Sequence, residues 1–331
     1  MRILYIGNWV RHGKFCSDEF KAARGFELER HEVRQVKYSR RGDLSAGGLV
    51  HDGLLPWTPD VAVWTKLSGG ICPLDLSRVD TIHNCPQVMW HWDLCTDRSN
   101  FGWFWKCLPE FDLFCHTERC RFEEWEKAYG TPCRYLDNAC DPEYHKAQGT
   151  PRPEWECDVG FIGDAHGLGQ RRALMQRLAK DFSVRAWSPF PTAWTRMDIP
   201  CDGPVYGDDI ADACASAKIM LGSSATTDCE GYWSNRIYTV MGSGGFFLTE
   251  YVPGLCDIVS PWSLSGPAHC DVFTTNHECM AIVKYWLRGS LHSSELRNDV
   301  ATRGCNHIRT NHTWQHRARQ MIAYLEELNL I

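Results

Sequence analysis

The sequence has 331 residues, of which 44% are hydrophobic and 12% aromatic, a balance typical of a globular protein and not of a disordered one. This length exceeds the usual size of one hydrophobic core, so two domains are expected. No apolar run is long enough to span a membrane. The 17 cysteines are scattered and odd in number, and the N-terminus lacks the pattern of a secretory signal. Together these features favour free thiols in a reducing cytoplasm.

The net charge of −6 is unevenly distributed. Residues 1–41 carry five more basic than acidic side chains, and the remainder carries eleven more acidic than basic ones. Such a local surplus is commonly a solvated helix face, but it also fits a surface that meets a polyanion. The charge therefore leaves a nucleic acid partner open without predicting one.

The first part of the chain alternates predicted strands and helices. MRILYIGN is an apolar run that stops at Gly7, residues 17–30 begin with a capping serine and continue at helical spacing, and EVRQVKY alternates as a strand. Further strands are predicted over 60–65, 86–92 and 112–117, then a helix over 118–129 and a strand at PCRYL. This alternation predicts a parallel sheet with helices on both faces.

Residues 137–156 are rich in proline and polar residues and are predicted to link two domains, 1–150 and 151–331. The pattern then restarts with the strand CDVGFIG, the helix GLGQRRALMQRLAKDF, the strand FSVRAW, the helix DDIADACASA and the strand KIMLGSS. The tail from residue 276 predicts three helices, the last of which can pack back on the first domain. The result is an α/β fold of two Rossmann-like domains facing each other across a cleft, with ligands at the carboxyl ends of the strands.

The segment SNRIYTVMGSGGFFLTEY, residues 234–251, combines a polar helix start with a glycine-rich end. Ser234 is a natural N-cap, and the first turn carries Asn235 and Arg236 in place of a carboxylate. Free amides and an arginine at a helix start suit an anion, most often a phosphate. The glycines at 242, 244 and 245 then end the helix before a short buried strand.

At these residues a family resemblance appears. YWSNRIYTVMGSGGFFLTEYVP, with CDVGFIG before it and FTTNHECMAIVKYWL and RGCNHIRTNHTWQHR after it, resembles the C-terminal domain of GT-B glycosyltransferases of the group-1 family, and is most similar to the spore-maturation (CgeB-like) branch found in bacteria and phages. FDLFCHTERCRFEEWEKAYGTPCRYLDNACDPEYH resembles the N-terminal partner domain. The resemblance implies a nucleotide sugar, most often a UDP-sugar, held by the second domain, an acceptor held by the first, and no obligatory metal.

The resemblance also implies donor-binding residues. The helix from Ser234 would direct the amides of Ser234 and Asn235 and the Arg236 guanidinium at the diphosphate, where they stabilise charge on the leaving nucleotide. Aligning the glycines puts Thr239, beside Tyr238, where the family usually has a glutamate for the ribose, and Glu230 is a candidate substitute. Gly163 ends the first strand of this domain, and in the loop and helix that follow, Arg171 and Arg172 are candidate phosphate contacts; a plain flexible turn and solvated arginines explain them equally well.

Acceptor and base candidates lie after strands of the first domain. Asp93, in HWDLCTD, is the strongest candidate base if the reaction inverts the anomeric centre; a retaining reaction needs none, and an ion pair or helix cap also explains it. The weaker base candidates are His91 and His12. The predicted acceptor contacts are Asn8, Trp9, His12 and His91. Trp90, Trp92, Trp103 and Trp105 are expected to be mostly core, with stacking on sugars or flipped bases as the alternative.

Several alternatives stay open. The acceptor hydroxyl fits a hydroxymethylated pyrimidine in phage DNA, a cell-surface glycan or a small molecule. A nicotinamide-dependent oxidoreductase would need a compact glycine fingerprint, whereas IGNWVRHGKF has glycines only at 7 and 13. An inactive nucleotide-sugar-binding module would explain the missing glutamate. Cys115, His116 and Cys120 are the closest approach to a metal cluster, but buried free thiols are the favoured interpretation.

Overall fold

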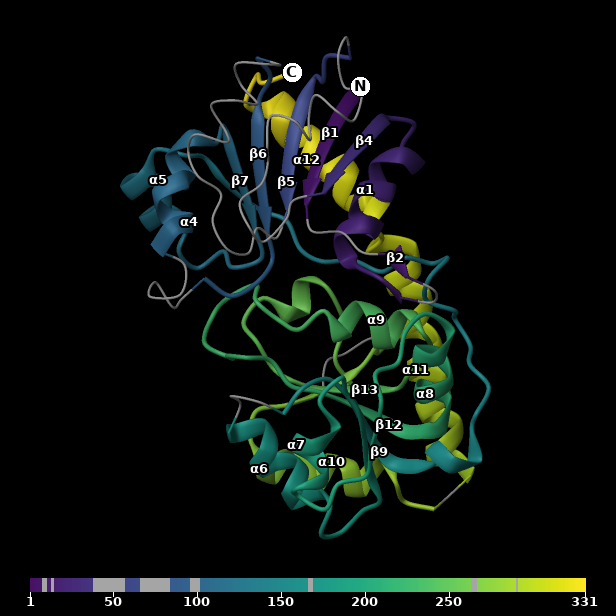
Figure 1. Cartoon of the computed structure of the whole chain (residues 1–331). Coiled ribbons are helices and arrows are strands. Elements are labelled where there is room, and N and C mark those ends of the chain that lie inside the picture. The colour runs from purple at the N-terminus through teal and green to yellow at the C-terminus, as the bar shows by residue number, and fades with distance from the viewer. Residues whose placement is uncertain are drawn as a thin grey trace. The chain divides into compact units, whose positions relative to one another are not determined.

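The structure is a computed structural model that describes residues 1–7, 11–12, 15–37, 57–65, 84–95, 102–165, 169–262, 267–289 and 291–331. The chain divides into two compact units, which Figure 1 shows together. The first unit comprises Met1–Asn138 and Trp314–Ile331, and the second unit comprises Ala139–Thr313.

The first unit is built on a six-stranded parallel sheet with the strand order β4-β1-β5-β6-β7-β8. The strands are β1 (Arg2–Gly7), β4 (Glu32–Lys37), β5 (Val61–Thr65), β6 (Gln87–His91), β7 (Leu113–His116) and β8 (Cys133–Tyr135). They lie where the sequence predicted them. A short antiparallel pair, β2 (Arg11–His12) and β3 (Phe15–Cys16), precedes the first helix.

Four α-helices belong to the described part of this unit: α1 (Asp18–Leu28), α4 (Gly102–Cys107), α5 (Phe122–Tyr129) and α12 (Trp314–Glu327). The Ser17 hydroxyl caps α1 by accepting the Phe20 N–H. Helix α5 ends at Gly130 in a left-handed conformation, as expected, but it begins at Phe122 and not at residue 118. The reason is that Thr117 and Glu118 are buried at the end of β7.

The C-terminal helix α12 packs along α1 beside the first unit's sheet (Figure 1). The approach is close: a Cβ on Gly25 of α1 would lie 2.5 Å from the carbonyl oxygen of Trp314. The Trp314 ring in turn contacts Trp90 and Trp92, with ring centroids 5.6 and 5.8 Å away. The last helix is therefore part of the first unit's core.

The second unit repeats the architecture, with the strand order β11-β10-β9-β12-β13-β14 and all pairs parallel. The strands are β9 (Cys157–Ile162), β10 (Val184–Trp187), β11 (Cys201–Asp202), β12 (Ala217–Gly222), β13 (Phe247–Glu250) and β14 (Asp271–Phe273). The helices are α6 (Gly169–Leu178), α7 (Pro191–Thr195), α8 (Asp208–Ser216), α9 (Arg236–Gly242), α10 (Asn276–Trp286) and α11 (Leu291–Asn311). The edge strands β11 and β14 were not predicted.

The segment predicted as a linker is bound to the second unit from residue 139 onward. Arg152 pairs with Asp209 at 2.5 Å and Asp212 at 2.6 Å in α8, and the Thr150 N–H also donates to Asp212. The Cys140 N–H donates to the carbonyl of His312. Because of these contacts, the boundary between the units lies between Asn138 and Ala139 and not at the predicted 150/151.

Both cores are apolar and rich in aromatic rings. The first centres on Trp64, Phe114 and Trp125, and the second on Phe161, Trp194 and Trp286. The described cysteines are all free thiols, and most are buried. None of the described helices has the length and apolar character needed to cross a bilayer.

Candidate active site

In the second unit, two arginines meet at the carboxyl ends of neighbouring parallel strands. Arg171 comes from α6, which follows β9, and Arg236 is the first residue of α9. Because β9, β12 and β13 run parallel and side by side, the residues after each strand gather at one edge of the sheet. This edge is where ligands bind in open α/β sheets. We refer to Arg171 and Arg236 as the guanidinium pair.

The guanidinium pair is held by shared backbone oxygens and one ring. Arg171 donates to the carbonyls of Asp164 (2.7 Å) and Ser223 (2.8 Å). Arg236 donates to Ser223 as well (3.2 Å), to the carbonyl of Ile162 and to the Ser234 hydroxyl. Both guanidinium carbons lie over Phe161, 5.1 and 4.6 Å from the ring centroid. The side chains are thus oriented before any ligand arrives.

No described residue forms an ion pair with either arginine of the guanidinium pair. Among the described residues, neither arginine has a carboxylate within ion-pair distance, and carbonyl oxygens carry no net charge. Among the described carboxylates, Glu250 at the end of β13 most favours their charged forms, but it accepts the Ser224 N–H. The Nε atom of buried Arg171 has no hydrogen-bond partner within the described chain. Two converging cations of this kind fit a doubly charged anion.

The pKa shifts agree with a positive, water-poor environment. Burial lowers the pKa of Arg171. Burial first and repulsion from Arg171 second lower the pKa of Arg236 to about 9. Both guanidiniums therefore stay protonated at neutral pH, and a bound anion would relieve their repulsion.

Gly163 makes room for the Arg236 side chain. Its φ is +146°, and a Cβ there would lie 2.6 Å from an Nη atom of Arg236 and 3.1 Å from the Phe161 ring. The predicted site residue Gly163 therefore lies in this site, and its backbone conformation and its lack of a side chain are both required.

Other predicted donor residues lie near the pair. The Ser234 hydroxyl accepts the Arg236 N–H at 3.4 Å, and the Ser234 N–H donates to Ser224. The helix itself begins at Arg236, one residue later than an N-cap at Ser234 predicts. Its cap residue Asn235 already has helical torsion angles and makes no side-chain cap hydrogen bond. Because α9 has seven residues, the guanidinium and not a long helix supplies most of the positive charge here.

Four predicted donor residues lie elsewhere or face away. Arg172 is exposed and its Nε contacts the Met197 sulfur, because adjacent helix residues point about 100° apart and Arg171 takes the site-facing direction. Tyr238 is fully buried, and its hydroxyl accepts the Trp233 indole N–H. Thr239 donates to the Asn235 carbonyl of its own helix. Glu230 is exposed on a turn.

In the first unit, Asp93 follows β6 and is partly exposed. Its backbone carbonyl accepts a hydrogen bond from His116 Nε2 at 3.0 Å. Two residues further on, the Cys95 N–H donates to buried Glu118 at 2.6 Å. The loop that carries the predicted base is therefore held by residues from the end of β7, a feature that sequence reasoning missed. Glu118 directly follows the predicted strand 112–117, and that position was the available signal.

The predicted acceptor contacts differ in their outcome. His91 is only 2% exposed, packed between Phe104 and His116, so its ring is a core group and not an acceptor contact. Asn8 and Trp9 lie outside the described residues, as does the side chain of His12. Trp90, Trp92 and Trp105 are buried and belong to the core, while the side chain of Trp103 is outside the described part.

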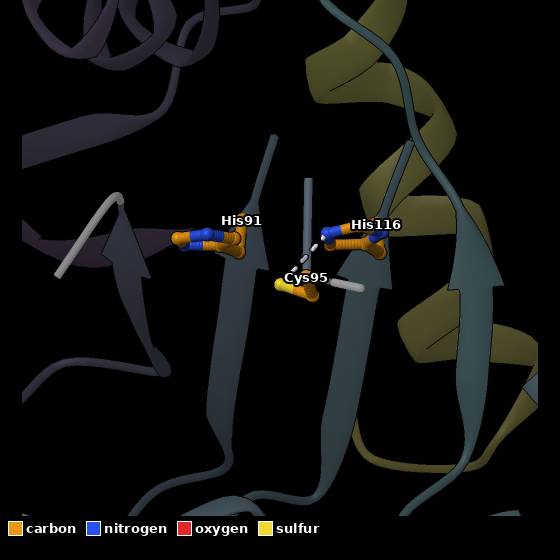
Figure 2. A group of neighbouring side chains, drawn as sticks. All are labelled: His91, Cys95 and His116. Atoms are coloured by element: carbon orange, nitrogen blue, oxygen red, sulfur yellow. Dashed lines mark hydrogen bonds between the residues drawn. The ribbon is translucent and has the colours of Figure 1, made fainter. Parts of the chain in front are cut away.

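One group of potential metal ligands occurs within the described residues: His91, Cys95 and His116, whose ligand atoms lie within 4.8 Å of one another (Figure 2). Its geometry opposes a metal. His116 Nδ1 accepts the Glu118 N–H at 2.8 Å, so Nε2, the atom facing Cys95, must carry the proton of the neutral ring. If Nε2 bound a metal, the ring proton would lie on Nδ1, and Nδ1 would donate a hydrogen bond instead of accepting one. Burial lowers the pKa of His116 to about 3, so the ring is neutral.

Comparison with known proteins agrees with this geometry. Residues 170–323 match the family model described as glycosyl transferase-like. No curated protein matches the chain significantly. Among solved structures, HepE from Anabaena, in complex with UDP and glucose, has 12% identity and a TM-score of 0.64 and covers 99% of this chain and 100% of its own.

Two further structures have the same fold. Sucrose-phosphate synthase from Thermosynechococcus elongatus has 8% identity and a TM-score of 0.66, with 99% of both chains covered. The catalytic domain of starch synthase IV from Arabidopsis thaliana, bound to ADP and acarbose, has 8% identity and a TM-score of 0.64, with 98% of this chain and 99% of that chain covered. The chain thus has the GT-B glycosyltransferase fold, and its residues 170–323 match the glycosyl transferase-like family model.

Proposed function

We propose that this chain is a glycosyltransferase that moves a sugar from a nucleoside diphosphate sugar to a hydroxyl acceptor. The observation that carries the proposal is the guanidinium pair, which lies at the carboxyl edge of a parallel sheet, has no carboxylate partner among the described residues, and falls within the matched range 170–323. The solved structures with this fold include one in complex with UDP and one bound to ADP. A UDP-sugar is the donor we propose, without an obligatory metal.

In the proposed reaction the acceptor oxygen bonds to the anomeric carbon while the bond from that carbon to the diphosphate oxygen breaks. Negative charge then grows on the leaving phosphate, and Arg171 and Arg236 would stabilise it more strongly than they stabilise the ground state. Arginine suits this role because its fork of donors matches two phosphate oxygens. Glu230 is proposed for the ribose, in place of the family's glutamate.

The acceptor side of the proposal rests on Asp93. As a partly exposed carboxylate at the end of β6, it can accept the proton that the acceptor hydroxyl releases in an inverting reaction. Asn8, Trp9 and His12 stay in the proposal as acceptor contacts, whereas buried His91 does not. We also propose a cytoplasmic location, since the described thiols are free.

We propose a glycan or small-molecule acceptor ahead of DNA because the chain as a whole has a net charge of −6. In the basic segment 1–41, Lys21 pairs with Asp18 and Arg34 with Glu32, two acids that the surplus of five already counts. Arg2 pairs with Asp60, outside the segment, so that contact compensates one further positive charge. The narrower proposal is that the chain is a CgeB-like, phage-encoded enzyme that transfers the sugar to a hydroxymethylated pyrimidine in DNA. It requires DNA binding that weakens steeply with salt and a target base that is flipped out of the duplex.

The experiment begins with a thermal-shift panel of UDP, GDP, ADP and CMP sugars, followed by donor hydrolysis and transfer to oligosaccharides, plain DNA and hydroxymethylated DNA. Stabilisation by one donor and sugar transfer support the proposal. Binding without hydrolysis or transfer would instead identify an inactive binding module. Labelled oligosaccharide with inert DNA would exclude the DNA version.

Arg236→Ala is the decisive variant. Because it removes the group proposed to stabilise the leaving phosphate, kcat should fall about 10²–10³-fold, as for loss of one oxyanion donor. The unfolding midpoint should change little, since a half-buried guanidinium without a carboxylate partner among the described residues is lost together with its hydrogen bonds. Steady-state kinetics and thermal unfolding test both points, and an unchanged kcat would contradict the assigned role.

A further inference from the structure

A buried carboxylate connects the ends of β6 and β7 in the first unit. These strands pair in parallel, with His91 opposite His116, so the loop after β6 and the residues after β7 emerge side by side. Glu118 is fully buried there. Its Oε1 accepts the Cys95 N–H at 2.6 Å, a short bond of the kind that a charged acceptor makes.

The same residue also fixes the His116 ring. The Glu118 N–H donates to His116 Nδ1 at 2.8 Å, which places the ring proton on Nε2 and directs it to the Asp93 carbonyl at 3.0 Å. Figure 2 shows the His116 ring directed from β7 toward Cys95. The two residues thus bind the peptide groups on both sides of Leu94. His116 donates to the Asp93 carbonyl, and Glu118 accepts from the Cys95 N–H.

Keeping a carboxylate in this position is costly. Burial raises the pKa of Glu118, and the Cys95 N–H bond and the Arg121 charge offset only part of that effect. Its Oε2 is buried without a hydrogen-bond partner among the described residues. A residue that only filled this space would be apolar, so the carboxylate indicates a demand on the loop that it holds.

We infer that Glu118 and His116 are positioning residues that fix Asp93 in place for proton abstraction from the acceptor. The inference rests on the proposed function, in which Asp93 is the base. Neither residue needs to touch the substrate. Their effect passes through the Asp93–Cys95 backbone, where a displacement of about 1 Å is enough to cost about 10²-fold in rate.

The test compares Glu118→Ala, Glu118→Gln and Asp93→Asn in the full-length chain. Glu118→Ala should lower kcat for sugar transfer by up to about 10²-fold with an unchanged KM for the donor, because the guanidinium pair is untouched. Glu118→Gln should keep most of kcat, since the amide oxygen still accepts the Cys95 N–H. Exposed Glu123 of α5 supplies the matched control, Glu123→Ala, which should behave as wild type.

The double variant Asp93→Asn/Glu118→Ala separates positioning from general stability. If Glu118 acts through Asp93, the double variant is no slower than Asp93→Asn alone, whereas independent effects multiply. Hydrogen exchange at the Cys95 amide should be faster in Glu118→Ala and unchanged in Glu118→Gln. If Glu118→Ala does not fold, His116→Phe keeps a ring of similar size, removes the donor to Asp93, and should show the same loss of kcat.

The outcomes distinguish the two proposals. The inference would be overturned, and the proposed function would stand, if the wild type transfers sugar and Asp93→Asn is slow while Glu118→Ala and His116→Phe keep wild-type kcat. Equal loss in Glu118→Gln and Glu118→Ala would overturn it too, because charge and not the hydrogen bond would then matter. A wild-type chain inactive with every donor, or a fully active Asp93→Asn variant, would remove the base on which it rests.

Discussion

At the scale of single residues, neighbouring arginines with the same chemistry have opposite environments. Arg171 is buried under Phe161 and shares the Ser223 carbonyl with Arg236, whereas Arg172 is exposed beside Met197. The sequence RR could not separate them, because the direction of each side chain depends on where α6 begins relative to the sheet. Arg172 therefore serves as a matched control for substitutions of Arg171.

We predict that Arg171→Ala weakens donor binding and Arg172→Ala does not. Loss of a charge-assisted contact costs about 1.5–3 kcal/mol, which corresponds to roughly a 10- to 100-fold higher Kd for the UDP-sugar. Isothermal titration of both variants with the same donor measures the difference. Equal Kd values in the two variants would remove Arg171 from the site.

Gly163 gives a second prediction at this scale. Replacing it by alanine puts a methyl group where Arg236 now lies and strains a backbone with positive φ. Gly163→Ala should therefore displace Arg236 and reproduce most of the kinetic loss of Arg236→Ala, although it changes no charge. Wild-type kcat in this variant would show that the close approach is not needed for turnover.

At the scale of elements, the apolar strands were predictable and the polar details were not. β1, β5, β6, β7, β9 and β12 each contain an apolar run, and that run alone locates them. β11 and β14 have two and three residues, one of them an aspartate in each strand, so they contain too short an apolar pattern to predict a strand. The predicted start of α5 at residue 118 was wrong. Glu118 resembles an acid of a first helical turn, but its carboxylate accepts the Cys95 N–H in the loop after β6.

The packing of α12 supports a stability prediction. Trp314 is 2% exposed and meets Trp90 and Trp92, so Trp314→Ala should lower the free energy of unfolding of the first unit by about 3–5 kcal/mol. Exposed Glu326 of the same helix offers the control Glu326→Ala, with little expected change. Chemical denaturation with tryptophan fluorescence and a donor-binding readout would assign the loss to one unit; equal stability of the two variants would contradict the packing role.

At the scale of the whole molecule, buried histidines link stability to pH. Burial lowers the pKa of His116 to about 3, while an unfolded histidine titrates near 6.5. Between these values the unfolded chain binds the extra proton, so stability is lost as the pH falls from about 6.5 toward 3. His269, whose pKa burial and His307 lower to about 4, acts in the same direction in the second unit.

The expected slope for His116 is about 1.4 kcal/mol per pH unit within that window. The depressed pKa values of Asp158 and Asp212 add their effect only at lower pH, below about 4. Urea unfolding at pH 7, 6 and 5 should therefore show falling stability, and His116→Phe should flatten the first unit's dependence. A profile that is flat in the wild type would show that His116 titrates normally.

The division of the chain has a consequence for synthesis. Residues 139–313 form one complete unit, whereas the first unit needs both residues 1–138 and residues 314–331. During translation the second unit therefore has its whole sequence outside the ribosome before the first one does, the reverse of the usual N-terminal-first order. Until the final helix emerges, Trp90 and Trp92 lack the contacts that they make with Trp314, so we expect the nascent chain at that stage to expose apolar surface.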